Sequence, residues 1–211
     1  MNTEHLLDLL ARNAGPAPRA PVARRLAPMV LLGVACSSLL ALWLVGPQPT
    51  ADFQTPAPWI KLAYAAALAV GAGLLTGRLA RPVHRLQPPR LLVWLTIGGM
   101  ALVGAAALGL TPPDDRLQAV LGHTWLQCPW TLMGLSLPAL AGILWAVRGL
   151  APTRPRQAGW ACGLLAGALG AAGYALACPE SSTPFIALWY TLGMLMTAEV
   201  GRRLGPLVLR W

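Results

Sequence analysis

Residues 91–110 read LLVWLTIGGMALVGAAALGL, an apolar stretch without a single charged side chain. A helix needs about 20 such residues to cross the roughly 30 Å hydrocarbon core of a membrane. The stretch does not alternate between apolar and polar positions, and lipid permits only helices or closed barrels as spanning structures. It therefore predicts a transmembrane helix.

Five further apolar runs of similar length occur along the chain, at residues 26–46, 60–77, 130–147, 158–177 and 184–200. The composition agrees with them: 56% of the 211 residues are hydrophobic, only 11% are charged, and the mean hydropathy is +0.57. A soluble domain usually carries about 25% charged residues. The sequence therefore predicts an all-α fold, with an integral membrane bundle of six transmembrane helices over residues 26–211, a tail over residues 1–25 and no soluble domain.

The basic residues predict the orientation of this bundle. Most of the 16 basic residues lie in the tail, in the second and fourth loops and at the C-terminus: Arg12, Arg19, Arg24, Arg25, Arg78, Arg81, Arg85, Arg90, Arg148, Arg154, Arg156, Arg202, Arg203 and Arg210. Only Lys61 and Arg116 fall on the other side. Because positive charge resists translocation, we expect both termini in the cytoplasm of a bacterium and the bundle in its inner membrane. Topology then accounts for the net charge of +9 without a nucleic-acid partner.

The fifth apolar run carries small residues at every fourth position: Gly159, Gly163, Gly167 and Ala171. This spacing predicts a flat groove that lets another helix approach closely. Packing within the chain is favoured over a dimer interface, and the sequence leaves the oligomeric state open.

Motifs for catalysis or transport are missing from the sequence. No apolar run has an Asp, Glu, Lys, Arg or His near its middle, although ion-coupled carriers usually need such a residue at membrane depth. Lys61 and Glu199 lie near the ends of runs, where we expect their side chains to reach the membrane interface. The chain has no Ser/His/Asp pattern, HExxH motif, phosphate loop or CxxC motif, so we do not expect an enzyme.

Two cysteines are the best candidates for chemistry. Cys128 precedes the fourth run and Cys178 follows the fifth, so the predicted antiparallel pair of helices brings both to the periplasmic side. Each is followed by proline, which marks a helix boundary. The two thiols could form a disulfide or bind a soft metal ion, with His123 and Glu180 as further ligands. A permanent disulfide and a responsive thiol pair both remain open, and we expect no other cofactor.

The N-terminal tail is the second candidate site. A cluster of leucines beside an acidic residue occupies Leu6, Leu7, Asp8, Leu9 and Leu10. The segment is too short to be a stable helix in water, so we expect it to fold against another surface. That surface is either the membrane or a partner protein that accepts a helix in a groove.

Short motifs over nearly the whole chain, densest from residue 121 onward, carry a resemblance to a known family. They are Cys128-Pro129, Leu137-Pro138, RGLAPTRP at 148–155, Ala158-Gly159, YALACPE at 174–180, Trp189-Tyr190, Leu192-Gly193, Gly205-Pro206 and Arg210-Trp211. With this set, the sequence resembles the NrsF-type negative regulators of extracytoplasmic-function sigma factors, which are six-helix membrane anti-sigma factors of Proteobacteria.

The resemblance implies a function for both candidate sites. A short cytosolic segment, here residues 3–10, holds a sigma factor at the membrane. A periplasmic cysteine pair, here Cys128 and Cys178, responds to metal or oxidative stress and leads to release of the sigma factor. The alternative is a membrane thiol-redox enzyme or a small permease. A thiol oxidase would need a second thiol pair and a permease a polar pathway, and the sequence shows neither.

Overall fold

The computed structural model describes residues 3–4, 21–49, 53–81, 87–150 and 152–210. These ranges contain helices and no strand, which confirms the all-α prediction. The long elements are α2 (Pro21–Leu44), α3 (Pro56–Leu79), α4 (Gln87–Leu110), α6 (Cys128–Arg148), α7 (Pro155–Tyr174) and α9 (Thr191–Val208). The short ones are η2 (Pro113–Asp115), α5 (Arg116–Leu121), α8 (Thr183–Phe185) and η3 (Ile186–Tyr190).

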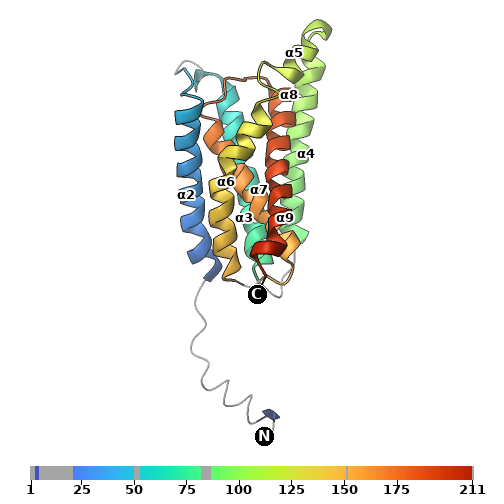
Figure 1. Ribbon diagram of the computed structural model, residues 1–211. Helices are drawn as coiled ribbons and strands as arrows, with labels where there is room; N and C mark the ends of the chain where they lie inside the picture. Colours follow the sequence, from blue (N-terminus) through green and yellow to red (C-terminus); the bar gives the residue numbers. More distant parts are fainter. Residues whose placement is uncertain (1–2, 5–20, 50–52, 82–86, 151, 211) are drawn as a thin grey trace.

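The long helices lie side by side, with roughly parallel axes (Figure 1). α2 begins and α9 ends at the same end of this bundle, and α5 lies at the opposite end. α8, η3 and α9 follow one another without a break, and η3 is a π-helical turn inside this helical segment. π turns inside α-helices occur frequently at functional sites.

Four helices are long and apolar enough to cross a membrane: Val22–Leu44 within α2, and α3, α4 and α6. The two remaining helices of the predicted six, α7 and α9, do not meet this criterion. α7 is rich in glycine and α9 carries Glu199, Arg202 and Arg203, and both features lower the mean hydropathy. Length and apolarity therefore support a membrane-associated bundle with four candidate spans.

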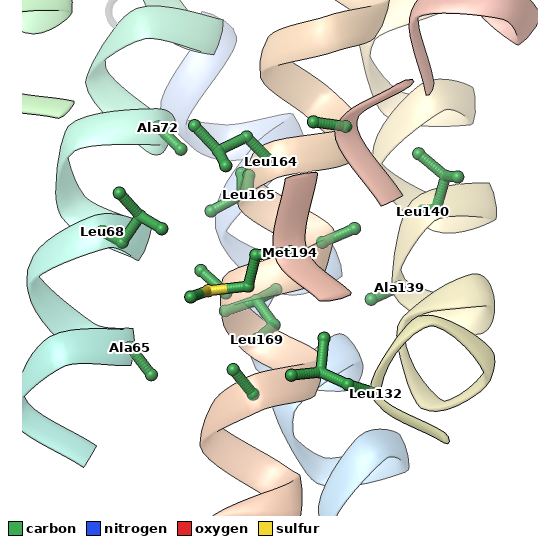
Figure 2. Packing of buried hydrophobic residues seen from close by; sticks show 14 of the residues in the cluster. Ala65, Leu68, Ala72, Leu132, Ala139, Leu140, Leu164, Leu165, Leu169 and Met194 are labelled. Atoms are coloured by element: carbon green, nitrogen blue, oxygen red, sulfur yellow. The ribbon is translucent and has the colours of Figure 1, made fainter. Parts of the chain in front are cut away.

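The position of α7 explains why it can be less apolar. It contacts α2, α3, α6 and α9, and most of its side chains are buried. Figure 2 shows its leucines facing residues of the neighbouring helices: Leu164, Leu165 and Leu169 of α7, with Ala65, Leu68 and Ala72 of α3, Leu132, Ala139 and Leu140 of α6, and Met194 of α9. A helix enclosed by other helices does not need the apolar surface that lipid requires.

The glycines of α7 pack against α9 in the same chain. A Cβ atom added to Gly163 would lie 2.7 Å from the Cα atom of Ala198, and one added to Gly167 would lie 2.9 Å from that of Met194. Both distances are too short for a side chain, so glycine is what allows the two backbones to meet. The predicted packing within the chain is confirmed.

Candidate thiol site

The structure brings the thiols of Cys128 and Cys178 together at the end of the bundle opposite the start of α2. Cys128 is the first residue of α6, and Cys178 lies in the loop that follows α7. Both side chains are fully buried, with 0% of their surface exposed, and both are free thiols. The two side chains lie close enough for each to influence the ionisation of the other.

Local backbone structure places Cys178 here. Beyond the end of α7, the N–H groups of Ala177 and Cys178 both donate to the carbonyl oxygen of Tyr174, at 3.0 and 2.9 Å. These bonds tighten the last turn before Pro179, which has no N–H group with which to continue the helix. The Tyr174 ring stacks on that of Tyr190 in η3, with 5.8 Å between centroids.

Lys61 is the functional candidate that the sequence missed. We expected its side chain at the membrane interface, but it is 0% exposed, so this prediction was wrong. Its Nζ atom donates to the carbonyl oxygen of Cys178 at 2.7 Å and lies 5.9 Å from the centroid of the Tyr190 ring. The only available signal was that the single lysine of the chain stands at the start of an apolar run.

Several nearby groups affect the ionisation of the Cys178 thiol. The neighbouring Cys128 side chain lowers the pKa of the Cys178 thiol, burial opposes this effect, and the nearby charge of Lys61 adds to the lowering. The Tyr190 hydroxyl lies near Cys178. This hydroxyl is buried and has no hydrogen-bond partner among the described residues.

Hydrogen bonds to Glu180 connect the loop before α6 to the loop after α7. Its Oε1 atom accepts hydrogen bonds from the N–H groups of His123 and Thr124, at 2.7 and 3.0 Å, and from the Thr124 hydroxyl at 3.1 Å. Gly122 has a φ of +56° and approaches Glu180 so closely that an added Cβ atom would lie 2.6 Å from Oε2. We call this set of contacts among residues 122–124 and Glu180 the Glu180 clasp.

The further ligands predicted for a metal ion do not join the thiols. The His123 side chain is exposed and pairs with Gln118, with 3.2 Å between their Nε2 atoms, while the Glu180 carboxylate is used in the clasp. Over the described ranges, no group of three or more His, Cys, Asp or Glu residues could hold a metal ion. Capture of a soft metal by the two thiols alone stays a prediction.

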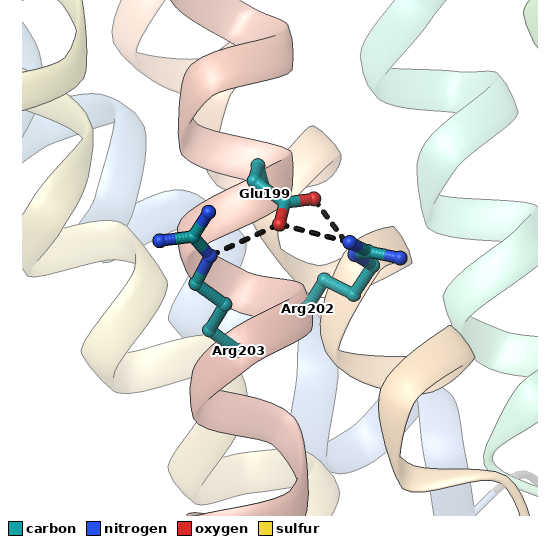
Figure 3. Close-up of polar contacts among 3 residues, drawn as sticks. All are labelled: Glu199, Arg202 and Arg203. Atoms are coloured by element: carbon teal, nitrogen blue, oxygen red, sulfur yellow. Dashed lines mark hydrogen bonds and ion pairs between the residues drawn. The ribbon is translucent and has the colours of Figure 1, made fainter.

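The opposite end of the bundle is rich in arginine, and the predicted partner-binding residues 6–10 lie outside the described residues. Two cavities open at this end. One of about 670 Å³ is lined by Arg24, Arg25, Arg148 and Trp145, and one of about 430 Å³ by Arg90, Arg156, Arg202 and Trp160, among others. Glu199 is half-exposed here and pairs with Arg202 at 2.7 Å and Arg203 at 3.0 Å (Figure 3).

Comparison with known proteins defines the class. A family model described as "Negative regulator of sigma F" (NrsF) matches residues 10–211. The chain is 39% identical over 213 residues to the "Probable anti-sigma-F factor NrsF" of Azospira oryzae, and 37% identical over 215 residues to the "Anti-sigma-F factor NrsF" of Caulobacter vibrioides. Both matches cover 100% of either chain, and no solved structure matches.

These matches place the chain among regulatory rather than catalytic proteins. It belongs to the NrsF family of anti-sigma-F factors, as its sequence motifs indicated. A sigma factor is therefore the partner class that the family implies, and the redox-enzyme and permease alternatives find no support in the comparisons.

Proposed function

We propose that this protein is a six-span inner-membrane anti-sigma factor that holds an extracytoplasmic-function sigma factor through residues 6–10 and releases it when Cys128 and Cys178 react. Membership of the NrsF family carries the proposal, because both full-length relatives are named as anti-sigma-F factors. The buried thiol pair adds a candidate for the stress response.

Six crossings agree with the arrangement of the helices. α2 begins and α9 ends at the same end of the bundle, as an even number of crossings requires. Arg24 and Arg25 lie near the start of α2, Arg148 ends α6, and Arg202 and Arg203 lie near the end of α9. The concentration of arginines supports placing this end in the cytoplasm.

The thiol pair suits a change of state on the other side of the membrane. Oxidation by a hydroperoxide would join the two sulfurs in a disulfide, with the hydroperoxide reduced to an alcohol and water. A soft metal ion would instead replace the thiol protons. Either change would link the two sulfurs, directly or through one ion, and so reposition the start of α6 and the loop after α7. To turn a regulator that is about 99% bound into one mostly released, the change must favour the released state by several kcal/mol.

Replacing Leu6 and Leu10 with Asp tests the proposed sigma-factor segment. Buried leucines contribute roughly 1.5–3 kcal/mol each, so the double variant is expected to weaken sigma-factor binding by about a hundredfold or more. The measurement is co-purification of the sigma factor with the membrane-extracted protein, together with transcription of its regulon. The control adds the same charge nearby, through Asn13→Asp with Ala14→Asp, and is expected to retain the sigma factor.

Unchanged co-purification with the leucine double variant contradicts this assignment. The arginine-lined cavities at the same end of the bundle would then become the next candidates for the binding surface. A variant that is absent from the membrane fraction is excluded from the comparison by immunoblotting.

A further inference from the structure

The cavity of about 670 Å³ at the arginine-rich end of the bundle lies between α2 and α6. The two helices pack against each other, and an added Cβ atom at Gly33 would lie 2.9 Å from the Cβ atom of Ala139. Nearer the end of the bundle, side chains of both helices line the cavity, among them Arg24, Arg25, Pro28, Met29, Trp145 and Arg148. Two long helices therefore build this cavity.

The charged part of the cavity is positive. Arg24 and Arg25 lie near the start of α2, Arg148 is the last residue of α6, and the described residues that line the cavity include no acid. Arg25 donates a hydrogen bond to the carbonyl oxygen of Gly149 at 2.6 Å, which ties the two helices together. Within the described part of the chain, the side chains of Arg24 and Arg148 form no hydrogen bond or ion pair. Two guanidinium groups are therefore available to an anion.

The second arginine-lined cavity, of about 430 Å³, differs in this respect. There Arg202 pairs with Glu199 at 2.7 Å, and Arg90 donates to the side-chain oxygen of Gln157 at 3.0 Å. Part of the positive charge at that cavity is thus compensated within the protein. The cavity between α2 and α6 offers more uncompensated charge, so an anion from outside the protein complements it better.

The remaining surface of this cavity is largely apolar. Met29 and Pro28 line it from α2, and Trp145 lines it from α6 with 70% of its surface exposed. Tryptophan is enriched at the level of the lipid head groups, where an apolar and a polar environment meet. A ligand that fits this cavity therefore combines a negatively charged head with an apolar body.

We propose that the cavity between α2 and α6 binds an anionic phospholipid, with its phosphate on Arg24 and Arg148 and its acyl chains along Met29 and Trp145. Basic pockets between membrane helices bind such head groups, and arginine binds phosphate through two parallel hydrogen bonds. The bound lipid joins the start of α2 to the end of α6. This inference goes beyond the proposed anti-sigma function and shares with it only the embedding of the bundle in a membrane.

Native mass spectrometry of the full-length protein in detergent, without a sigma factor, measures lipid affinity. Dioleoylphosphatidylglycerol is expected to bind more tightly than dioleoylphosphatidylcholine, which has the same acyl chains but no net charge. Arg24→Gln with Arg148→Gln is expected to weaken binding of the anionic lipid roughly 30-fold, because basic residues near a membrane surface attract anionic lipid. The control is Arg81→Gln with Arg154→Gln, which removes two exposed arginines that do not line the cavity and is expected to leave binding unchanged.

A photoreactive residue locates the lipid without removing a charge. Benzoylphenylalanine in place of Trp145, in nanodiscs with equal amounts of the two lipids, is expected to capture dioleoylphosphatidylglycerol in excess. The same residue in place of Trp43 is the control, because Trp43 is 81% exposed near the other end of α2. At that position, capture is expected to follow the composition of the bilayer.

Several results overturn the proposal. These are equal affinities for the two lipids, equal losses of affinity in the two double variants, or equal capture ratios at positions 145 and 43. Binding of inorganic phosphate as tightly as the anionic lipid would assign the cavity to a small anion, and capture of an added sigma factor at position 145 in place of lipid would assign it to a protein. The capture ratio needs no arginine variant, so it decides the question even where those variants do not fold. Failure of the lipid assignment leaves the proposed anti-sigma function standing, because Leu6 and Leu10 test that function separately.

Discussion

Cys128 and Cys178 show what single residues contribute to this protein. Each is fully buried, and each contacts the other and the region around Lys61. Cys162 is a useful comparison, because it is also fully buried but lies in the first half of α7, towards the arginine-rich end. Burial is thus common to three cysteines, whereas a thiol partner distinguishes two of them.

Serine at either position of the pair is expected to abolish release of the sigma factor under oxidative stress. Serine cannot form a disulfide and is a poor ligand for soft metals. The measurement is induction of the sigma-factor regulon in cells that carry Cys128→Ser, Cys178→Ser or the control Cys162→Ser, which is expected to respond normally. Full induction in both pair variants would show that the sensor lies elsewhere.

Gly163 shows how closely α7 and α9 approach. A Cβ atom there meets the backbone of Ala198 at 2.7 Å, whereas one added to Gly98 of α4 meets nothing within 4 Å. Gly163→Val is therefore expected to destabilise the bundle by about 1–3 kcal/mol, the usual cost of overpacking. Thermal unfolding in detergent measures the effect, with Gly98→Val as the control. Equal melting temperatures for the two variants would refute the close packing of α7 on α9.

The Glu180 clasp joins structural elements rather than single residues. Besides the bonds to Glu180, the Ser182 hydroxyl donates to the carbonyl oxygen of Ala119 at 2.6 Å. The indole N–H of Trp189, in η3, donates to that of Val120 at 2.9 Å. The segment from α5 to α6 is thus tied to the chain that follows Cys178, and this contact closes the end of the bundle around the thiols.

Glu180→Ala is expected to loosen this closure and expose Cys178. Hydrogen bonds to a charged group contribute about 1.5–3 kcal/mol, so local opening becomes roughly 10- to 100-fold more frequent. Iodoacetamide labelling of Cys178 is expected to accelerate by that factor. Glu199→Ala is the matched control, because Glu199 also accepts three hydrogen bonds, at the other end of the bundle (Figure 3). Equal labelling rates in the two variants would rule out the clasp as the barrier.

The whole molecule has two chemically different ends. Arginines lie at the end of the bundle where α2 begins and α9 ends. The thiols lie at the other end, where the described residues include Arg116 of α5. Four helices are apolar enough to span a membrane, and α7 is enclosed by its neighbours. In the proposed function, the thiol end therefore faces the periplasm and the arginine-rich end, where the sigma factor would bind, faces the cytoplasm.

Reporter fusions test this orientation. Fusions after Arg81 and after Thr153 are expected to report the cytoplasm, because they follow the arginine-rich ends of α3 and α6. Fusions after Pro113 and after Ser181 are expected to report the periplasm. Alkaline phosphatase and green fluorescent protein serve as paired reporters with opposite responses. Phosphatase activity after Thr153 would contradict the arrangement of six crossings.

The sequence by itself determined the helical class and the family. Runs of about 20 apolar residues without alternation leave a helix as the only open-chain solution in lipid, because every backbone group must be satisfied within its own segment. Glycines at every fourth residue of 158–177 predicted the close helix contact that α7 makes with α9. The motifs from Cys128 onward are short and local, so the chain itself was enough to indicate the NrsF family.

Only the tertiary structure showed that α7 is enclosed by other helices and that Lys61 is buried beside Cys178. Composition cannot separate a helix that faces lipid from one enclosed by other helices, and α7 is the enclosed kind. Lys61 is separated by 117 residues from Cys178, whose carbonyl oxygen it binds, so no local pattern connects them. Packing of α3 against α7 brings the ammonium to the thiols, and burial makes its charge matter there, because a charge is screened far less in the interior than in water.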